Sequence, residues 1–195
     1  MQDISPRPAP DPGVDPATLK PNIRLFGSVD EAMLAKVLDG ISALPTDEPL
    51  VMDLTTMGGD ADIGRRIALE VRIVQDSGRP AYFLGKSSVF SAGVTIMGAF
   101  PASSRFLDRD CVLLIHERRI EKQIAFSGPL RSNLQMAHEF IAQLESGIAL
   151  QEVGFRELIR GTNLSMEELR SRVSTTNWYV PAAEALELGL VAGLF

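Results

Sequence analysis

Apolar residues in the first part of the chain follow two spacings, one typical of strands and one typical of helices. A short apolar run at 23–27 predicts a strand, and Ser28 with Glu31 three residues later predicts a capping box that opens a helix through about Leu44. The continuous apolar run at 49–56 then predicts a buried strand. A strand, a helix and a second strand therefore follow one another.

The next helix is predicted between Asp60 and Gly78, where apolar residues recur at every third or fourth position: Ile63, Ile67, Val71 and Val74. Asp60 is a candidate cap for its start, and Gly78 marks its end. A strand at 80–85 and a helix at 91–100 repeat the unit.

The second half of the chain continues this alternation. An apolar run at 111–116 predicts a strand, and a long helix begins near Pro129. Ser165 with Glu168 forms another capping box, and Pro181 opens a last short helix. Strands that alternate with helices predict an α/β layered domain with a largely parallel sheet.

The first 22 residues differ from the rest in composition. Six of the twelve prolines lie in the first 21 residues, where they prevent both a helix and a strand ladder. We therefore expect a flexible arm at 1–22, followed by a single domain at 23–195.

Charge and hydrophobicity narrow the function classes. The chain has 45% hydrophobic and 23% charged residues and a formal charge of −6, which is typical of a soluble globular protein and argues against nucleic acid as a partner. Acidic residues lie between the arginines of the central segment, so we expect a solvated face there, formed by Arg105, Arg109, Arg118 and Arg119.

Location and redox state follow from what the sequence lacks. No apolar run approaches the roughly 20 residues that span a bilayer, and no secretory signal is recognisable. A single cysteine, Cys111, excludes an intrachain disulfide, and its place at the start of a buried strand predicts an inert thiol. We expect a cytoplasmic protein.

Candidate chemistry lies in three loops that leave the carboxyl ends of predicted strands, where parallel sheets collect reactive groups. Gly58 and Gly59 form a turn that either binds a ligand through its amides or simply joins strand to helix. Ser91 precedes Ala92 at a helix start, where it is either a nucleophile or a cap. His116 ends the following strand and could serve as general base for Ser91.

Other polar residues fit this site less well. His138 lies on the apolar side of the long helix and is interpreted as a packing or interface residue. Asp108 and Asp110 enter the strand of His116 from its opposite end, and Glu117 should point to the other face of that strand. No carboxylate is therefore an attractive third member.

From about Ile23 to Phe195, the chain resembles the proteolytic subunit of the Clp protease (ClpP), within the ClpP/crotonase superfamily. Three segments carry the resemblance: Thr56-Met57-Gly58-Gly59-Asp60, Phe90-Ser91-Ala92-Gly93-Val94 and Leu114-Ile115-His116-Glu117-Arg118. The separation of Ser91 from His116 is also typical of that family. The resemblance implies a layered fold of strand-helix units with a long protruding helix.

The resemblance also implies the roles of individual residues. Ser91 would be the nucleophile and His116 the general base and then acid, while the amides of Gly59 and Ala92 would form the oxyanion hole. Asn177 stands where the family has the triad aspartate, and an amide can orient an imidazole but cannot stabilise its positive charge. The implied activity is a serine-type endopeptidase with a weakened triad, working through an acyl-enzyme without metal or organic cofactor.

Partners are implied in the same way. The family suggests a peptide or unfolded protein as substrate and a homo-oligomeric ring, for which Leu134, Ile141 and Ile148 offer an apolar stripe that could equally be core. The segment after His116 is longer and more charged than in the family, and the Pro-rich arm lacks the loops that contact an unfoldase. We therefore assume neither ring stacking nor an ATPase chaperone as partner, and both stay open.

Three alternatives remain open. A catalytically silent scaffold or regulatory subunit would keep the fold, and Asn177 supports it. A crotonase-type enzyme acting on acyl-CoA shares the fold but leaves Ser91 and His116 without a role. A Ser-Lys dyad would need Lys86 or Lys122 as base.

Overall fold

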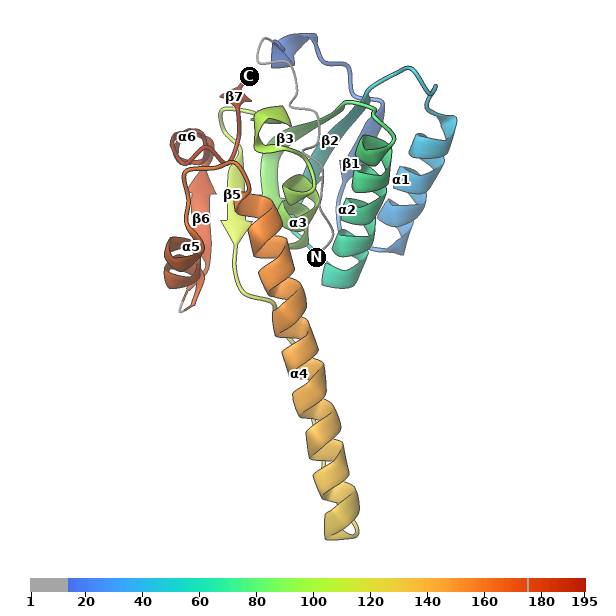
Figure 1. Ribbon diagram of the computed structural model, residues 1–195, viewed down its shortest axis with the longest axis vertical. Helices are drawn as coiled ribbons and strands as arrows, with labels where there is room; N and C mark the ends of the chain where they lie inside the picture. The colour runs from blue at the N-terminus through green and yellow to red at the C-terminus, as the bar shows by residue number, and fades with distance from the viewer. Residues whose placement is uncertain (1–13, 175) are drawn as a thin grey trace.

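A seven-stranded sheet forms the centre of the molecule in the computed structural model, which describes residues 14–174 and 176–195 (Figure 1). Five strands follow one another in parallel, in the order β1, β2, β3, β4, β7. Their bounds are Ile23–Phe26, Leu50–Thr56, Ala81–Phe90, Arg105–Leu107 and Gly193–Leu194. The predicted α/β domain with a largely parallel sheet is confirmed.

The strand β3 is shared between two neighbours. Its first half pairs with β4, and its second half, 88–90, pairs with β5 (Val112–Ile115). Ser87 lies at the switch with a φ of 58°, which lets the strand change direction. An antiparallel strand, β6 (Trp178–Pro181), extends the sheet beyond β5.

Helices α1 (Glu31–Ala43), α2 (Ala61–Asp76) and α3 (Ala92–Gly98) follow the first three strands. Near the chain's end lie two short helices, α5 (Met166–Val173) and α6 (Ala182–Glu187). Single 3₁₀ turns occur at Pro16–Thr18 and Ala102–Ser104.

The helix α4 (Leu130–Ile159) has 30 residues and extends far from the body of the molecule (Figure 1). It begins one residue after Pro129, as predicted, and only its last turns contact the body, through the buried Phe155 and Leu158. Leu134, Ile141 and Ile148 are 57%, 49% and 58% exposed, so the apolar stripe does not belong to this chain's own core.

Two of the three expected helix caps are confirmed. The side chain of Asp60 accepts from the amides of Asp62 and Ile63, and Ser165 accepts from that of Glu168. The prediction for α1 is wrong by two residues, because Asp30 is the cap and accepts from the Met33 amide at 2.9 Å. A carboxylate accepts this bond as well as the hydroxyl of Ser28 would.

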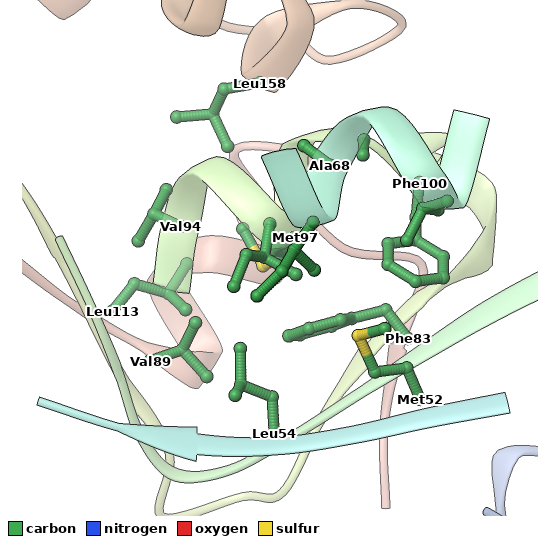
Figure 2. Close-up of a cluster of buried hydrophobic side chains, with 14 of the residues drawn as sticks. Met52, Leu54, Ala68, Phe83, Val89, Val94, Met97, Phe100, Leu113 and Leu158 are labelled. Atoms are coloured by element: carbon green, nitrogen blue, oxygen red, sulfur yellow. The ribbon is translucent and has the colours of Figure 1, made fainter. Parts of the chain in front are cut away.

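The main core lies between the sheet and the first helices (Figure 2). Met52 and Leu54 from β2 and Phe83 from β3 point toward Met97 of α3, and Leu158 closes the layer from the base of α4. A smaller cluster covers the opposite face of the sheet, where Leu19 and Phe195 pack against Val51, Leu84 and Phe106.

The start of the domain is tied to the sheet before residue 23. The side chain of Asn22 donates to the Pro49 carbonyl and accepts from the Val51 amide. Residues 1–13 of the expected arm lie outside the described residues, so the arm at 1–22 stays a prediction.

Arg105 contradicts the expected solvated face, because it is only 1% exposed. Its guanidinium donates five hydrogen bonds to main-chain carbonyls, which belong to Gly98, Phe100, Glu157, Leu158 and Leu190. Burial lowers the pKa of Arg105 to about 9, so the group stays a cation at neutral pH. It satisfies the carbonyl ends of α3 and α4 together, where the helix dipoles favour a positive charge.

Replacing Arg105 with methionine should destabilise the fold by about 3 kcal/mol or more, because five buried carbonyls would lose their donor. Urea unfolding of the wild type and variant measures this difference. Arg109→Met, at an exposed neighbouring position, is the control and should change stability by less than about 0.5 kcal/mol. Equal stabilities of the two variants would contradict the assigned role.

Candidate functional site

Ser91 occupies a sharp turn between β3 and α3. Its φ of 55° and ψ of −115° are unusual for a residue with a side chain, and such strain is typical of nucleophile turns at the end of a strand. Its hydroxyl makes no capping bond to the helix that follows. The interpretation of Ser91 as a simple cap therefore fails, and its hydroxyl stays available.

The turn of Ser91 is held by main-chain bonds. The Ser91 amide donates to the Leu114 carbonyl at 2.9 Å, and the Ser91 carbonyl accepts from Val94. Since Leu114 lies two residues before His116, this bond connects the end of β5 directly to the serine turn.

The glycine turn after β2 lies against Ser91. A Cβ on Gly58 would lie 2.8 Å from the Ser91 Cβ, and Gly58 has a φ of 102°. A Cβ on Gly59 would lie 2.4 Å from the Val29 carbonyl oxygen. Only glycine fits at either position, because any side chain would collide with its neighbours.

Two main-chain amides beside Ser91, those of Gly59 and Ala92, have no hydrogen-bond acceptor among the described residues. The Val29 amide donates to the Gly58 carbonyl, and the Val29 carbonyl accepts from the Asp60 amide. Neither bond involves the Gly59 amide. The amide of Ala92 is at the first position of α3, where no intrahelical partner exists. Neither N–H has an acceptor within 14–174 or 176–195, so both are candidate donors to a negatively charged oxygen.

His116 and Ser91 line the same pocket, which has a volume of about 70 Å³. The Nδ1 atom of His116 lies 2.5 Å from the Glu117 carbonyl oxygen. A carbonyl can only accept, so Nδ1 of the neutral ring carries the proton and Nε2 is left as an acceptor. This is the tautomer that a general base for a hydroxyl requires.

Asn177 lies next to the last pair of β5 and β6, Ile115 with Trp178, on the side of His116, but its amide makes no hydrogen bond to the imidazole. Its Oδ1 accepts from the Arg119 guanidinium at 2.5 Å, and no hydrogen bond within the described part of the chain joins Ser91, His116 and Asn177 to one another. The structure thus brings two members of the expected triad into one pocket, while the third, beside the neighbouring strand, bonds to Arg119 instead of the imidazole.

The sequence patterns do not point to Arg65 or Gln151, and they predict Arg118 and Arg119 on a solvated face and not in this region. The Gln151 side chain accepts from the Arg118 amide at 2.6 Å, and the Arg118 guanidinium pairs with Asp62. These contacts join α2, the segment after His116 and α4. No sequence pattern relates residues that are 33 and 56 positions apart.

A second cavity, of about 430 Å³, lies between the segment after His116 and α4. Arg118, Gln151 and Leu150 line both cavities, so the two cavities lie side by side along α4.

The lysines required for a Ser-Lys dyad do not line the pocket of Ser91. Lys86 pairs with Asp53 at 2.6 Å. Lys122 donates to Gln143 and lies over the Phe140 ring. These contacts disfavour both lysines as bases.

His138 is exposed on α4 and so is not part of the core that the described residues form. No group of three or more His, Cys, Asp or Glu side chains in 14–174 and 176–195 could hold a metal ion. Within the same residues, no helix has both the length and the apolar character to cross a membrane.

Known proteins similar to this chain are Clp protease subunits. No protein-family model matches it. The ATP-dependent Clp protease proteolytic subunit 2 of Treponema pallidum (strain Nichols) is 26% identical over 180 residues, covering 88% of this chain and 80% of that protein. A solved asparagine-to-aspartate mutant of ClpP1 from Listeria monocytogenes is 18% identical, with a TM-score of 0.70 over 89% of this chain and 91% of that chain.

These similarities confirm the resemblance that the three loops suggested. The chain is similar to Clp protease proteolytic subunits, and its fold is the ClpP fold.

Cys111 should be inert in the native protein. It is 1% exposed, and burial together with the charge of Asp108 raises the pKa of its thiol to about 12. A disulfide reagent at pH 8 should find no reactive thiol in the folded protein and one in denaturant. Raising the pH to 9 should accelerate the reaction severalfold in denaturant, whereas the folded protein should stay unlabelled because its thiol is buried. Rapid reaction of the folded protein would contradict this expectation.

Proposed function

We propose that this ClpP-like protein is a serine-type endopeptidase that works through an acyl-enzyme. One observation carries the proposal: the strained Ser91 turn opens into the same pocket as His116, beside two unpartnered amides. The residues Ser91, His116, Gly59 and Ala92 belong to three loops that follow different strands.

In the proposed reaction, the Ser91 hydroxyl attacks a peptide carbonyl while Nε2 of His116 takes its proton. The amides of Gly59 and Ala92 stabilise the oxyanion of the tetrahedral intermediate. His116 then protonates the leaving amine, which departs and leaves an ester on Ser91. Water, deprotonated by His116, hydrolyses the ester and releases the carboxylic acid.

The third member of the triad, the group that accepts from Nδ1 of His116, explains why the triad would be weak. In the structure the Glu117 carbonyl, and not Asn177, holds the Nδ1 proton of His116. Neither group has a full negative charge to stabilise the imidazolium that forms during attack. Release of Asn177 from Arg119 would allow its amide to act as the orienting group.

The second candidate is a proteolytically silent subunit, and the contact between Arg119 and Asn177 favours it. A scaffold needs the fold and the assembly surface but no aligned triad. A crotonase-type acyl-CoA enzyme is less favoured, because it assigns no function to the conformation of Ser91.

We also propose a homo-oligomeric ring that acts on peptides or unfolded proteins. The exposed apolar stripe of α4 supports assembly, since an unpartnered apolar helix face is costly in water. The two cavities that lie side by side along α4 support an extended substrate.

A fluorophosphonate should label Ser91 covalently. The reagent attaches only to an activated serine, so mass spectrometry of the labelled peptide locates the nucleophile. Ser91→Ala should abolish labelling, whereas Ser88→Ala, three residues earlier on β3, should retain it. An assembled, folded sample that shows no label on Ser91 would refute the peptidase proposal.

A carboxylate at position 177 should increase peptide hydrolysis, most strongly when Arg119 no longer competes for it. Asn177→Asp alone would form an ion pair with Arg119 and gain little. Combined with Arg119→Gln, it should raise kcat by at least about tenfold, because an aspartate stabilises the imidazolium.

A double-mutant cycle compares the wild type, Asn177→Asp, Arg119→Gln and the double variant. It gives the coupling energy between positions 119 and 177, with Arg119→Gln as the control. A silent subunit would gain nothing from any of them, and that result would favour the scaffold over the peptidase.

A further inference from the structure

We propose that Arg65 makes the site selective for substrates with an acidic side chain, Asp or Glu, on the residue whose carbonyl Ser91 attacks. This proposal rests on the proposed function and specifies its substrate class. The juxtaposition behind it is a guanidinium without a carboxylate partner in the wall of the pocket that contains the candidate nucleophile.

Arg65 lies on α2 and is half-buried, and it lines the 70 Å³ pocket together with Ser91 and His116. Its single hydrogen bond among the described residues is a long one, 3.4 Å from Nη1 to the Leu150 carbonyl. A guanidinium has five N–H donors, so most of its donor capacity is unused.

Neighbouring arginines differ from Arg65 in this respect. On the same helix, Arg66 pairs with Glu70 and Arg72 pairs with Glu157. In the same pocket, Arg118 pairs with Asp62. Within 14–174 and 176–195, no carboxylate lies within ion-pair distance of Arg65, although the chain has a net charge of −6.

The other walls of the pocket are largely apolar, so the charge of Arg65 determines which substrate side chain the pocket favours. Val94, Ile115, Phe155 and Leu158 contribute apolar wall, and the volume suits a small side chain. A carboxylate that enters such a pocket loses water and needs a cation in compensation. Arg65 can supply a two-pronged hydrogen bond, which an uncharged side chain of the same shape receives only weakly.

The position of the pocket determines which residue of the substrate binds in it. It contains Ser91 itself, so the side chain that enters it belongs to the residue acylated on Ser91. The larger cavity along α4 would receive neighbouring residues of the substrate.

The test uses fluorogenic peptides that are identical except for Asp, Asn, Leu or Lys at the acylating residue. For the full-length wild type, kcat/KM for Asp should exceed that for the isosteric Asn by at least about tenfold. In Arg65→Met, which keeps an unbranched apolar stem, the ratio of Asp to Asn should fall to about one. Arg65→Glu should prefer Lys, and that reversal cannot come from a general loss of structure.

The matched control is Arg66→Met, which removes a guanidinium from the adjacent residue at the helix surface. It should leave the ratio of Asp to Asn unchanged. Equal rates for Asp and Asn with the wild type, or an unchanged ratio in Arg65→Met, would overturn the proposal while the peptidase function stands.

Binding separates this proposal from the peptidase function. The same peptides are titrated into Ser91→Ala and into Ser91→Ala with Arg65→Met, with fluorescence polarisation as the readout. Tighter binding of the Asp peptide that depends on Arg65 supports the proposal even if the wild type hydrolyses nothing, in which case only the peptidase function fails. Equal binding of Asp and Asn peptides overturns it.

Discussion

The hydrogen bond from the Ser91 amide to the Leu114 carbonyl is the constraint on which the candidate site depends. It continues the pairing of β3 with β5 by one residue beyond Phe90 and holds Ser91 in a backbone conformation that a free chain would rarely adopt. Because His116 follows Leu114 by two residues, the same bond sets the position of the imidazole. The nucleophile turn and the histidine are therefore placed by one register of strand pairing.

Both ends of α3 are fixed, by different means. At its start, Gly58 allows the glycine turn to lie against Ser91 without a clash. At its end, Arg105 bonds to carbonyls of both α3 and α4 and so joins the short helix to the base of the long one. The buried guanidinium of Arg105 thus joins the two helices through their carbonyls, where an apolar contact would otherwise be expected. The pocket beside Ser91 lies between these two helices, so its shape depends on this clamp.

Charged side chains around the pocket divide into paired and unpaired groups. Arg118 is engaged by Asp62, and Arg119 engages Asn177, whereas Arg65 has only a carbonyl contact. The first two contacts organise the segment that follows His116. The second contact also occupies the Asn177 amide oxygen, and the Glu117 carbonyl acts as hydrogen-bond acceptor for the imidazole. The arrangement combines a candidate nucleophile and a candidate base with a third position that makes no hydrogen bond to the imidazole among the described residues.

Local patterns in the sequence determined the alternation of strands and helices and the start of α4. They also determined the caps Asp60 and Ser165 and the three loops with Ser91 and His116. The reason is that spacing and capping act over a few residues. The strands β4 and β7 were missed because three and two residues show no period, and β6 was missed because it ends at Pro181, which was interpreted only as a helix start. Only the tertiary structure decided that Arg105 is buried, that Asn177 contacts Arg119, and that Arg65 borders the pocket of Ser91. These contacts join residues far apart in the chain, and which groups meet there depends on how the layers pack.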